Sequence, residues 1–386
     1  MTAVIERERR AFLTGNEVVA WAALAAGAEV MFGYPITPQN EIMHYWARLA
    51  PRYGRKFLQT EDELSAGYAT IGAVLGGVKA FTATAGPGHV LMQEALAMAE
   101  MMRLPVVAII TQRGGPSTAT VIYSQQEVNL ACFGGNGEGF RLVYSVAGLQ
   151  DLYEYTLKAF GMAWRYRLPT IVLGDGYQAK MRGPVKLFDP ARQGIDTGMA
   201  APFLGAAGTP GRERPPVHLR NTYNLEEELL AVVEEQARSF EQVAEQVAEY
   251  EEEKREGAAI LLVAHGIVAR AAQLAAGRLR RRGKAVGFFR PVTLRPFPET
   301  ALRRAAFEAE MVLVAESAWG QLERLVRASL SGSEVPVQAY RRPGMGITPE
   351  ELEEELEKIL AARKSSGWSR GDEVAARAAD ATGLAP

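Results

Sequence analysis

The stretch Met31-Phe32-Gly33-Tyr34-Pro35-Ile36-Thr37-Pro38 decides the fold, because it reads as a short apolar strand that runs into a polar turn and a helix. Thr37 is expected to cap this helix, and Pro38 to lie in its first turn, where proline is tolerated. A second strand-to-helix turn follows in Phe57-Leu58-Gln59-Thr60-Glu61-Asp62-Glu63. Two more come at regular spacing: Thr84-Ala85-Gly86-Pro87-Gly88 and Gln112-Arg113-Gly114-Gly115-Pro116-Ser117. Ligands of open α/β sheets bind at the edge where such turns converge, so the pattern predicts a site for an anionic organic ligand.

Alternating helices and strands from residue 15 to about 180 predict an α/β fold built on a doubly wound parallel sheet. Pro105–Thr111 is a continuous apolar run, as is typical of a strand buried on both faces. Residues 181–222 read as an extended linker, and residues 225–254 as one long charged helix. A second α/β unit begins at Ala258, with strands expected at 260–264, 285–289, 311–316 and 335–340.

The composition of the 386-residue chain argues against several classes of protein. Its net charge of −2 argues against a nucleic-acid binder, which would show a basic face. We expect no membrane span, because no run of 18 apolar residues occurs, and a cytoplasmic location, because the charged N-terminus lacks a secretory segment. Cys132 is the only cysteine, so the chain alone can hold neither a disulfide nor a four-cysteine iron–sulfur cluster.

The histidines do not suggest a metal site either. All four are scattered along the chain without metal-ligand spacing, and we expect them at the surface or satisfied in the core: His44, His89, His218 and His265.

Three polar features at the predicted sheet edge are candidates for chemistry. Arg113 follows a buried strand and can grip a carboxylate or phosphate with two hydrogen bonds, although a structural ion pair explains it equally well. Glu61, Asp62 and Glu63 are accounted for by capping and by the helix dipole, unless one of them is a buried glutamate that tunes a cofactor. Thr37 is explained as an N-cap, but its hydroxyl faces the same edge.

The motifs together resemble the α subunit of 2-oxoacid:ferredoxin oxidoreductases, over roughly residues 12–345. In the first unit the resemblance is carried by Gly15-Asn16-Glu17, Tyr34-Pro35-Ile36-Thr37-Pro38, Glu61-Asp62-Glu63-Leu64, Thr82–Gly88 and Gln112–Thr118. In the second unit it is carried by Pro291-Val292-Thr293-Leu294-Arg295-Pro296-Phe297-Pro298 and Glu316-Ser317-Ala318-Trp319-Gly320-Gln321-Leu322.

The resemblance implies a thiamine diphosphate enzyme divided between subunits. Residues 12–190 would form its pyrimidine-side domain, residues 191–257 a linker and long charged helix, residues 258–345 a transketolase C-terminal-like domain, and residues 346–386 a C-terminal helix and tail. A β subunit would hold the diphosphate, Mg²⁺ and a [4Fe–4S] cluster. Further γ and δ subunits, ferredoxin or flavodoxin, and coenzyme A as cosubstrate complete the implied system.

The resemblance also implies roles for single residues. Glu63 would hydrogen-bond the aminopyrimidine ring nitrogen and favour the imino tautomer, which takes the thiazolium proton. Pro35, Ile36 and Gly86 would line the cofactor site. Arg113 would hold the substrate carboxylate, with a hydrogen bond from Thr37. The segment after Thr118 departs from familiar 2-oxoglutarate members, and no additional basic residue stands out, so an uncharged 2-oxoacid such as pyruvate or a branched-chain acid is favoured.

Two alternatives to this assignment remain open. One is a non-catalytic scaffold or regulatory subunit, which the intact set of Thr37, Glu63 and Arg113 argues against. The other is a nucleotide-binding α/β enzyme such as a ligase, which the lack of a phosphate-cradling glycine motif argues against. Gly174-Asp175-Gly176 resembles the start of a magnesium diphosphate motif, but no asparagine follows until Asn221, so it is rejected as a metal site.

Overall fold

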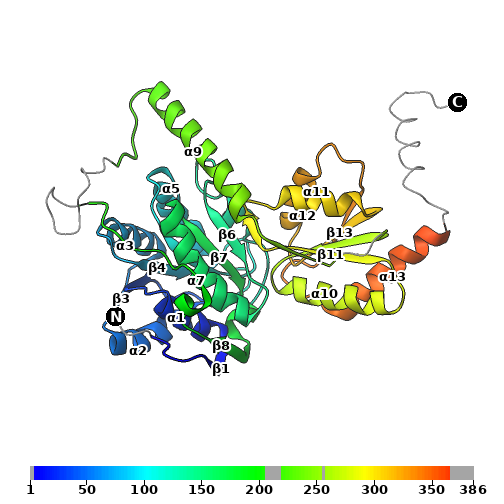
Figure 1. Cartoon of the computed structure of the whole chain (residues 1–386), viewed down its shortest axis with the longest axis horizontal. Coiled ribbons are helices and arrows are strands. Elements are labelled where there is room, and N and C mark those ends of the chain that lie inside the picture. Colours follow the sequence, from blue (N-terminus) through cyan, green and yellow to red (C-terminus); the bar gives the residue numbers. More distant parts are fainter. Residues whose placement is uncertain (1–3, 205–218, 254–256, 366–386) are drawn as a thin grey trace. The chain divides into compact units, whose positions relative to one another are not determined.

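Two compact units make up the computed structural model, which describes residues 4–204, 219–253 and 257–365 (Figure 1). The first unit runs to Ala248 and also includes Thr293–Pro296. The second unit contains Glu249–Val292 and the chain from Phe297 onward. His218 and the tail after residue 365 lie outside the described residues.

The first unit is built on a seven-stranded sheet that is parallel except for one edge strand. In sheet order its strands are β12 (Thr293–Arg295), β6 (Leu142–Ser145), β7 (Thr170–Asp175), β5 (Val107–Gln112), β4 (Ala80–Thr84), β2 (Val30–Gly33) and β3 (Lys56–Gln59). Only β12 is antiparallel to its neighbour. The sheet is doubly wound, as the sequence predicts, so the turns that follow β2, β3, β4 and β5 lie at one edge.

Helices cover both faces of this sheet (Figure 1). The main core lies between the sheet and three helices: α1 (Gly15–Ala25), α2 (Asn40–Leu49) and α7 (Leu149–Tyr166). Phe81 and Ala83 of β4 belong to this core. Side chains alternate along a strand, so Thr82 and Thr84 point to the other face, where α3 (Glu63–Leu75) and α5 (Gln93–Met101) pack closely.

The segment after residue 181 is not the extended linker that the sequence suggested. β8 (Arg182–Leu187) pairs antiparallel with β1 (Arg9–Thr14), a strand that the pattern did not predict. A 3₁₀ helix follows at Pro190–Gln193. Residues 205–218 of the expected linker lie outside the described part of the chain.

The long charged helix exists as α9 (Glu226–Val247) in the first unit, but it is shorter than predicted, because Tyr250–Glu253 form a strand, β9, instead of its last turn. Its buried side chains Phe240, Val243 and Val247 contact Leu142 and Leu168. Among the described residues, neither α9 nor any other helix is long and apolar enough to cross a membrane.

The second unit contains a five-stranded sheet. In sheet order its strands are β14 (Val337–Arg341), β13 (Met311–Glu316), β10 (Ile260–Ala264), β11 (Val286–Pro291) and β9 (Tyr250–Glu253), and only β9 is antiparallel. Its helices are α10 (Gly266–Arg281), α11 (Glu299–Phe307), α12 (Gln321–Ser329) and α13 (Pro349–Ser365). Arg278 of α10 and Arg282, which directly follows this helix, form ion pairs with α13.

Candidate active site

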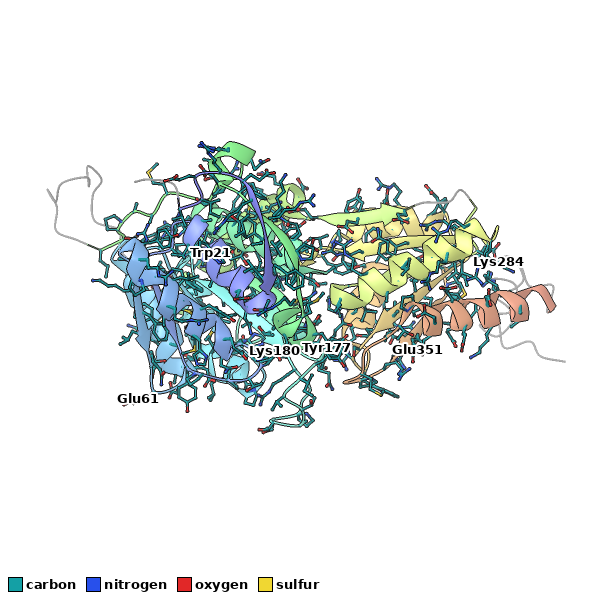
Figure 2. All side chains as sticks on the ribbon, turned by 90° about the horizontal axis from the view of Figure 1, so that it is seen from below. Trp21, Glu61, Tyr177, Lys180, Lys284 and Glu351 are labelled. Atoms are coloured by element: carbon teal, nitrogen blue, oxygen red, sulfur yellow. The ribbon has the colours of Figure 1, made fainter. Side chains whose placement is uncertain are left out.

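Glu63 is the first residue of α3, and only 4% of it is exposed. Its neighbour Asp62 caps the helix, because the Asp62 Oδ1 accepts a hydrogen bond from the Ser65 amide at 2.7 Å. Glu61 is exposed and lies at the margin of the first unit (Figure 2). Burial raises the pKa of the Glu63 carboxyl, while the charge of Arg113 opposes this shift. Of the three acids, Glu63 alone is both buried and not needed as a cap.

A glycine turn, Gly86-Pro87-Gly88, separates Glu63 from Arg113. A Cβ on Gly88 would lie 2.2 Å from the Glu63 Oε1 and 2.3 Å from the Thr84 Oγ1. A Cβ on Gly86, whose φ is +52°, would lie 2.5 Å from the Arg113 Nε. A side chain at either position would displace a neighbouring group, so the turn lies in close contact with Glu63 at Gly88 and with Arg113 at Gly86.

Arg113 follows β5 and is buried, with 4% exposed. Its Nη1 donates a hydrogen bond to the Thr37 carbonyl oxygen at 2.8 Å, and its Nε is buried without a partner among the described residues. Burial lowers the pKa of the guanidinium, whereas the carboxylates of Glu127 and Glu63 raise it. Arg113 therefore remains a cation, and its Nε–H is a hydrogen-bond donor that no described residue uses.

The turn after β2 brings Thr37 to this edge, but Thr37 is not the helix cap that we expected. α2 begins at Asn40, and its N-cap residue Gln39 makes no capping hydrogen bond through its side chain. Thr37 is exposed in a turn, and its main-chain carbonyl accepts the hydrogen bond from the Arg113 Nη1. The cap prediction was wrong because the helix starts two residues later than the proline signal suggested.

The other residues predicted on this turn are less buried. Pro35 is exposed and Ile36 is half-buried, both directly after β2. The buried Asn16 fixes the turn from α1, since its Nδ2 donates hydrogen bonds to the Pro38 carbonyl at 3.0 Å and to the Glu41 Oε2 at 3.1 Å.

Glu127 is a site residue that the sequence reasoning missed. It is 5% exposed, and its Oε1 accepts hydrogen bonds from the Gly86 and Arg113 amides, each at 2.9 Å. Its Oε2 lies 2.8 Å from the Nδ1 of His89. Its position in the sequence could have indicated a site residue, because Glu127 lies in a polar segment that follows the Arg113 turn and directly precedes α6 (Val128–Phe133).

The remaining histidines and the Gly-Asp-Gly motif have structural explanations. His44 is exposed, whereas His265 is buried, and burial together with Arg290 lowers its pKa to about 3. Asp175 caps α8 (Gly176–Lys180) by accepting a hydrogen bond from the Gln178 amide at 2.9 Å. A Cβ on Gly176 would lie 1.3 Å from the Ile122 carbonyl oxygen. Both roles are structural, so the motif is explained without a metal.

Two buried polar atoms at this edge have no partner among the described residues, the Oγ1 of Thr84 and the Nε of Arg113. The Glu63 carboxyl and the Thr84 Oγ1 both border Gly88, and the Arg113 Nε borders Gly86. Such a set fits a ligand with a protonatable ring nitrogen next to an anionic substrate. The described residues contain no group of three or more potential metal ligands.

Comparison with known proteins shows which family the chain resembles. A family model described as "Pyruvate flavodoxin/ferredoxin oxidoreductase, thiamine diP-bdg" matches residues 21–252, and "Pyruvate:ferredoxin oxidoreductase core domain II" matches residues 258–352. The 2-oxoglutarate synthase subunit KorA of Methanocaldococcus jannaschii is 32% identical over 89% of this chain and 98% of the relative. The ketoisovalerate oxidoreductase subunit VorB of Methanothermobacter thermautotrophicus is 33% identical over 89% of this chain and 96% of the relative.

Solved structures agree as well. The 2-oxoglutarate:ferredoxin oxidoreductase from Magnetococcus marinus, with 2-oxoglutarate, coenzyme A and succinyl-CoA bound, has a TM-score of 0.81 and 27% identity. The match covers 92% of this chain and 66% of that chain. A split-gene transketolase, at 14% identity and a TM-score of 0.54, shares the fold.

The fold and the site define a thiamine diphosphate-dependent oxidoreductase subunit, with a pyrimidine-side α/β domain followed by a transketolase C-terminal-like domain. The chain belongs to the pyruvate flavodoxin/ferredoxin oxidoreductase family, the 2-oxoacid:ferredoxin oxidoreductases. The fold class and the family predicted from the motifs are both confirmed.

Proposed function

We propose that this chain is the α subunit of a cytoplasmic 2-oxoacid:ferredoxin oxidoreductase. The enzyme oxidises a 2-oxoacid to an acyl-CoA and CO₂ and passes two electrons to ferredoxin or flavodoxin. The observation that carries the proposal is the position of Glu63 and Arg113 on the two sides of the Gly86–Gly88 turn. Because the Glu63 carboxyl and the Arg113 guanidinium border the same turn, we assign them to one ligand-binding site.

Glu63 is the residue that activates the cofactor. Thiamine diphosphate, when bound, supplies the nucleophilic carbon and the electron sink of the reaction. The Glu63 carboxyl would hydrogen-bond the aminopyrimidine ring nitrogen of the bound cofactor and hold a proton there. Its raised pKa suits this role, because a carboxyl that titrates closer to neutral pH exchanges a proton more readily.

Arg113 binds the substrate carboxylate, and Thr37 supports it. The Nη1 of Arg113 donates a hydrogen bond to the Thr37 carbonyl, which fixes the plane of the guanidinium. Its Nε is then left to donate to the substrate carboxylate. The Thr37 hydroxyl, on an exposed turn, is available to donate a hydrogen bond to the same carboxylate. Pro35 and Ile36 form the wall of the cofactor site on this side.

A β subunit completes the site. Exposed apolar side chains surround Glu63: Leu64 and Tyr68 on α3, and Val90 and Leu91 on α4 (Pro87–Leu91). An apolar patch around a catalytic acid is typical of a surface that another chain covers. We assign the diphosphate, Mg²⁺ and the [4Fe–4S] cluster to that chain, with coenzyme A as cosubstrate and γ and δ subunits as further members.

The substrate is a 2-oxoacid without a second carboxylate, such as pyruvate or a branched-chain acid. The loop that follows Arg113 presents Val121 and Ile122 rather than a basic residue. A second carboxylate on the substrate would meet apolar groups here and lose hydration without a partner.

Reconstitution with a partner chain tests the proposal. The full chain is co-expressed with the candidate β subunit, and reduction of a viologen dye is measured with a panel of 2-oxoacids and coenzyme A. We expect turnover only with the partner, fastest with uncharged 2-oxoacids, and its loss in Glu63→Gln. Glu61→Gln is the matched control and should retain activity, because Glu61 is exposed. Turnover by the single chain, or full activity of Glu63→Gln, would contradict the proposal.

A further inference from the structure

Glu127 joins three segments of the active-site edge through one carboxylate. Its Oε1 accepts the amides of Gly86, in the turn after β4, and of Arg113, at the end of β5, each at 2.9 Å. Its Oε2 lies 2.8 Å from the His89 Nδ1, one residue beyond Gly88. The carboxylate therefore links the turn that borders Glu63 to the main chain that carries Arg113.

The burial of this group makes its hydrogen bonds consequential. Glu127 is 5% exposed and His89 is fully buried. If the carboxylate is removed, two main-chain amides are left without partners away from water, which destabilises this arrangement of the turns. The two strand-end turns are then no longer linked at this point, and Arg113 can shift relative to Glu63.

His89 is oriented by the same carboxylate. We assign the proton of this contact to the His89 Nδ1, which then donates to the Glu127 Oε2. The His89 Nε2 is buried without a partner in the described part of the chain, so it makes no competing bond that would turn the ring. His89 thereby fixes the first turn of α4, where Gly88 lies against the Glu63 carboxyl.

We propose that Glu127 and His89 are a positioning pair that sets the distance and orientation between Arg113 and Glu63. The inference rests on the proposed function for the roles of these two charged residues. Neither member of the pair contacts the substrate or the cofactor. The carboxylate acts through Arg113 and Gly86, and the imidazole acts through Gly88.

Two variants separate position from charge. Glu127→Gln keeps the length of the side chain, and its amide oxygen can still accept both main-chain amides. Its NH2 group then faces His89, which can accept at Nδ1 by moving its proton to the unpartnered Nε2. Glu127→Asp keeps the charge but is one methylene shorter, so it cannot reach all three partners. We expect Glu127→Asp to raise the KM for the 2-oxoacid by about tenfold or more, since displacements near 1 Å have effects of up to about 100-fold. Glu127→Gln should stay within about threefold of the wild type.

Outcomes of the opposite kind overturn the inference. Wild-type kinetics in Glu127→Asp would show that the link is not needed. Equal damage in Glu127→Gln and Glu127→Asp would show that the charge, not the position, matters. Glu100→Gln is the matched control: Glu100 is 5% exposed and bonded to Arg141 at 3.0 Å and 3.1 Å, away from the turn. It should lower the melting temperature without moving the KM.

A second measurement does not depend on turnover. Phenylglyoxal labelling of the full chain, located by peptide mass spectrometry, should modify Arg113 slowly in the wild type and several-fold faster in Glu127→Asp. In ¹⁵N-histidine NMR spectra, the signal lost in His89→Gln should show the Nδ1–H tautomer. Unchanged labelling, or an Nε2–H tautomer, overturns the positioning pair. Failure of the wild-type complex to oxidise any 2-oxoacid overturns the proposed function instead.

Discussion

Replacing Gly88 with alanine tests the geometry of the site most sharply, because the new methyl group enters the space beside Glu63. The added Cβ would lie 2.2 Å from the Glu63 Oε1 and 2.3 Å from the Thr84 Oγ1. Carbon and oxygen atoms in contact prefer separations of about 3.5 Å. The carboxyl of Glu63 must therefore move by about 1 Å or the turn must open.

The two ways of relieving the clash affect different quantities: opening the turn lowers the stability of the fold, and moving the carboxyl lowers the catalytic rate. Inserting a methyl group into a packed interior destabilises by about 1–3 kcal/mol. A displacement of about 1 Å in a catalytic group lowers the rate by up to about 100-fold. Because the nearest atoms belong to Glu63 rather than to the main chain, we expect the carboxyl to move first. The loss in kcat/KM should then exceed what the change in stability explains.

The assay is 2-oxoacid-dependent dye reduction by the assembled complex, together with thermal unfolding of the chain. Gly72→Ala is the matched control, since Gly72 is exposed on the same helix α3 and its Cβ would meet no atom within 4 Å. This control should raise the stability by about 0.5–1 kcal/mol and leave the rate unchanged. If Gly88→Ala retains kcat/KM within twofold, the Glu63 carboxyl does not occupy this position in the working enzyme.

Three further predictions concern Arg113, Glu63 and Cys132. Arg113→Ala should raise the KM by about 10- to 100-fold, which corresponds to about 1.5–3 kcal/mol for a hydrogen bond to a charged group. Arg113→Lys should give a KM between those of Arg113→Ala and the wild type. An unchanged KM in Arg113→Ala would show that Arg113 does not bind the substrate. Burial raises the pKa of Glu63, so its ionised form destabilises the folded chain, and this contribution grows as pH rises above the unfolded value of about 4.3. Glu63→Gln should therefore unfold at a higher temperature than the wild type at pH 8 and at the same temperature near pH 4; a difference that does not vary with pH would be inconsistent with this cause. Burial raises the pKa of the Cys132 thiol to about 12, so a thiol reagent at pH 8 should label it only after urea unfolding, and rapid labelling of the folded chain would show that α6 opens.

The turns at the sheet edge could be predicted from sequence because they are local. Each combines an apolar strand with glycine, proline or capping residues within about ten positions, and these patterns have a direct physical meaning. The choice of Glu63 over Glu61 came from the family motif, and in the structure Glu63 is the buried one of the two. Asp62 takes the capping bond, which leaves the next residue to turn inward.

The contacts that were missed join segments far apart in the chain. β1 carries Arg9 and Arg10 and looks like a charged tail, yet it pairs with β8, far along the chain. Thr293–Arg295 follow a strand of the second unit, but they add to the sheet of the first. Glu127 stands 41 residues from its partner Gly86. No local pattern encodes such pairings, because they depend on how the whole sheet folds.

The Thr37 cap failed for a different reason. Threonine before proline is a sound signal for a helix start, but here α2 begins at Asn40. The residues between them form a turn that is held by Asn16 through the Pro38 carbonyl and by Arg113 through the Thr37 carbonyl. Tertiary hydrogen bonds therefore displaced the start of the helix from the place that the local preference favoured.

Exchange of the thiazolium C2 proton of thiamine diphosphate, followed by NMR in the assembled complex without substrate, tests the central claim most directly. If Glu63 controls the proton at the aminopyrimidine, the wild type should exchange this proton rapidly and Glu63→Gln should be slower by about 100- to 10,000-fold. Glu61→Gln should match the wild type. Equal exchange rates in Glu63→Gln and the wild type would show that this chain does not supply the activating acid.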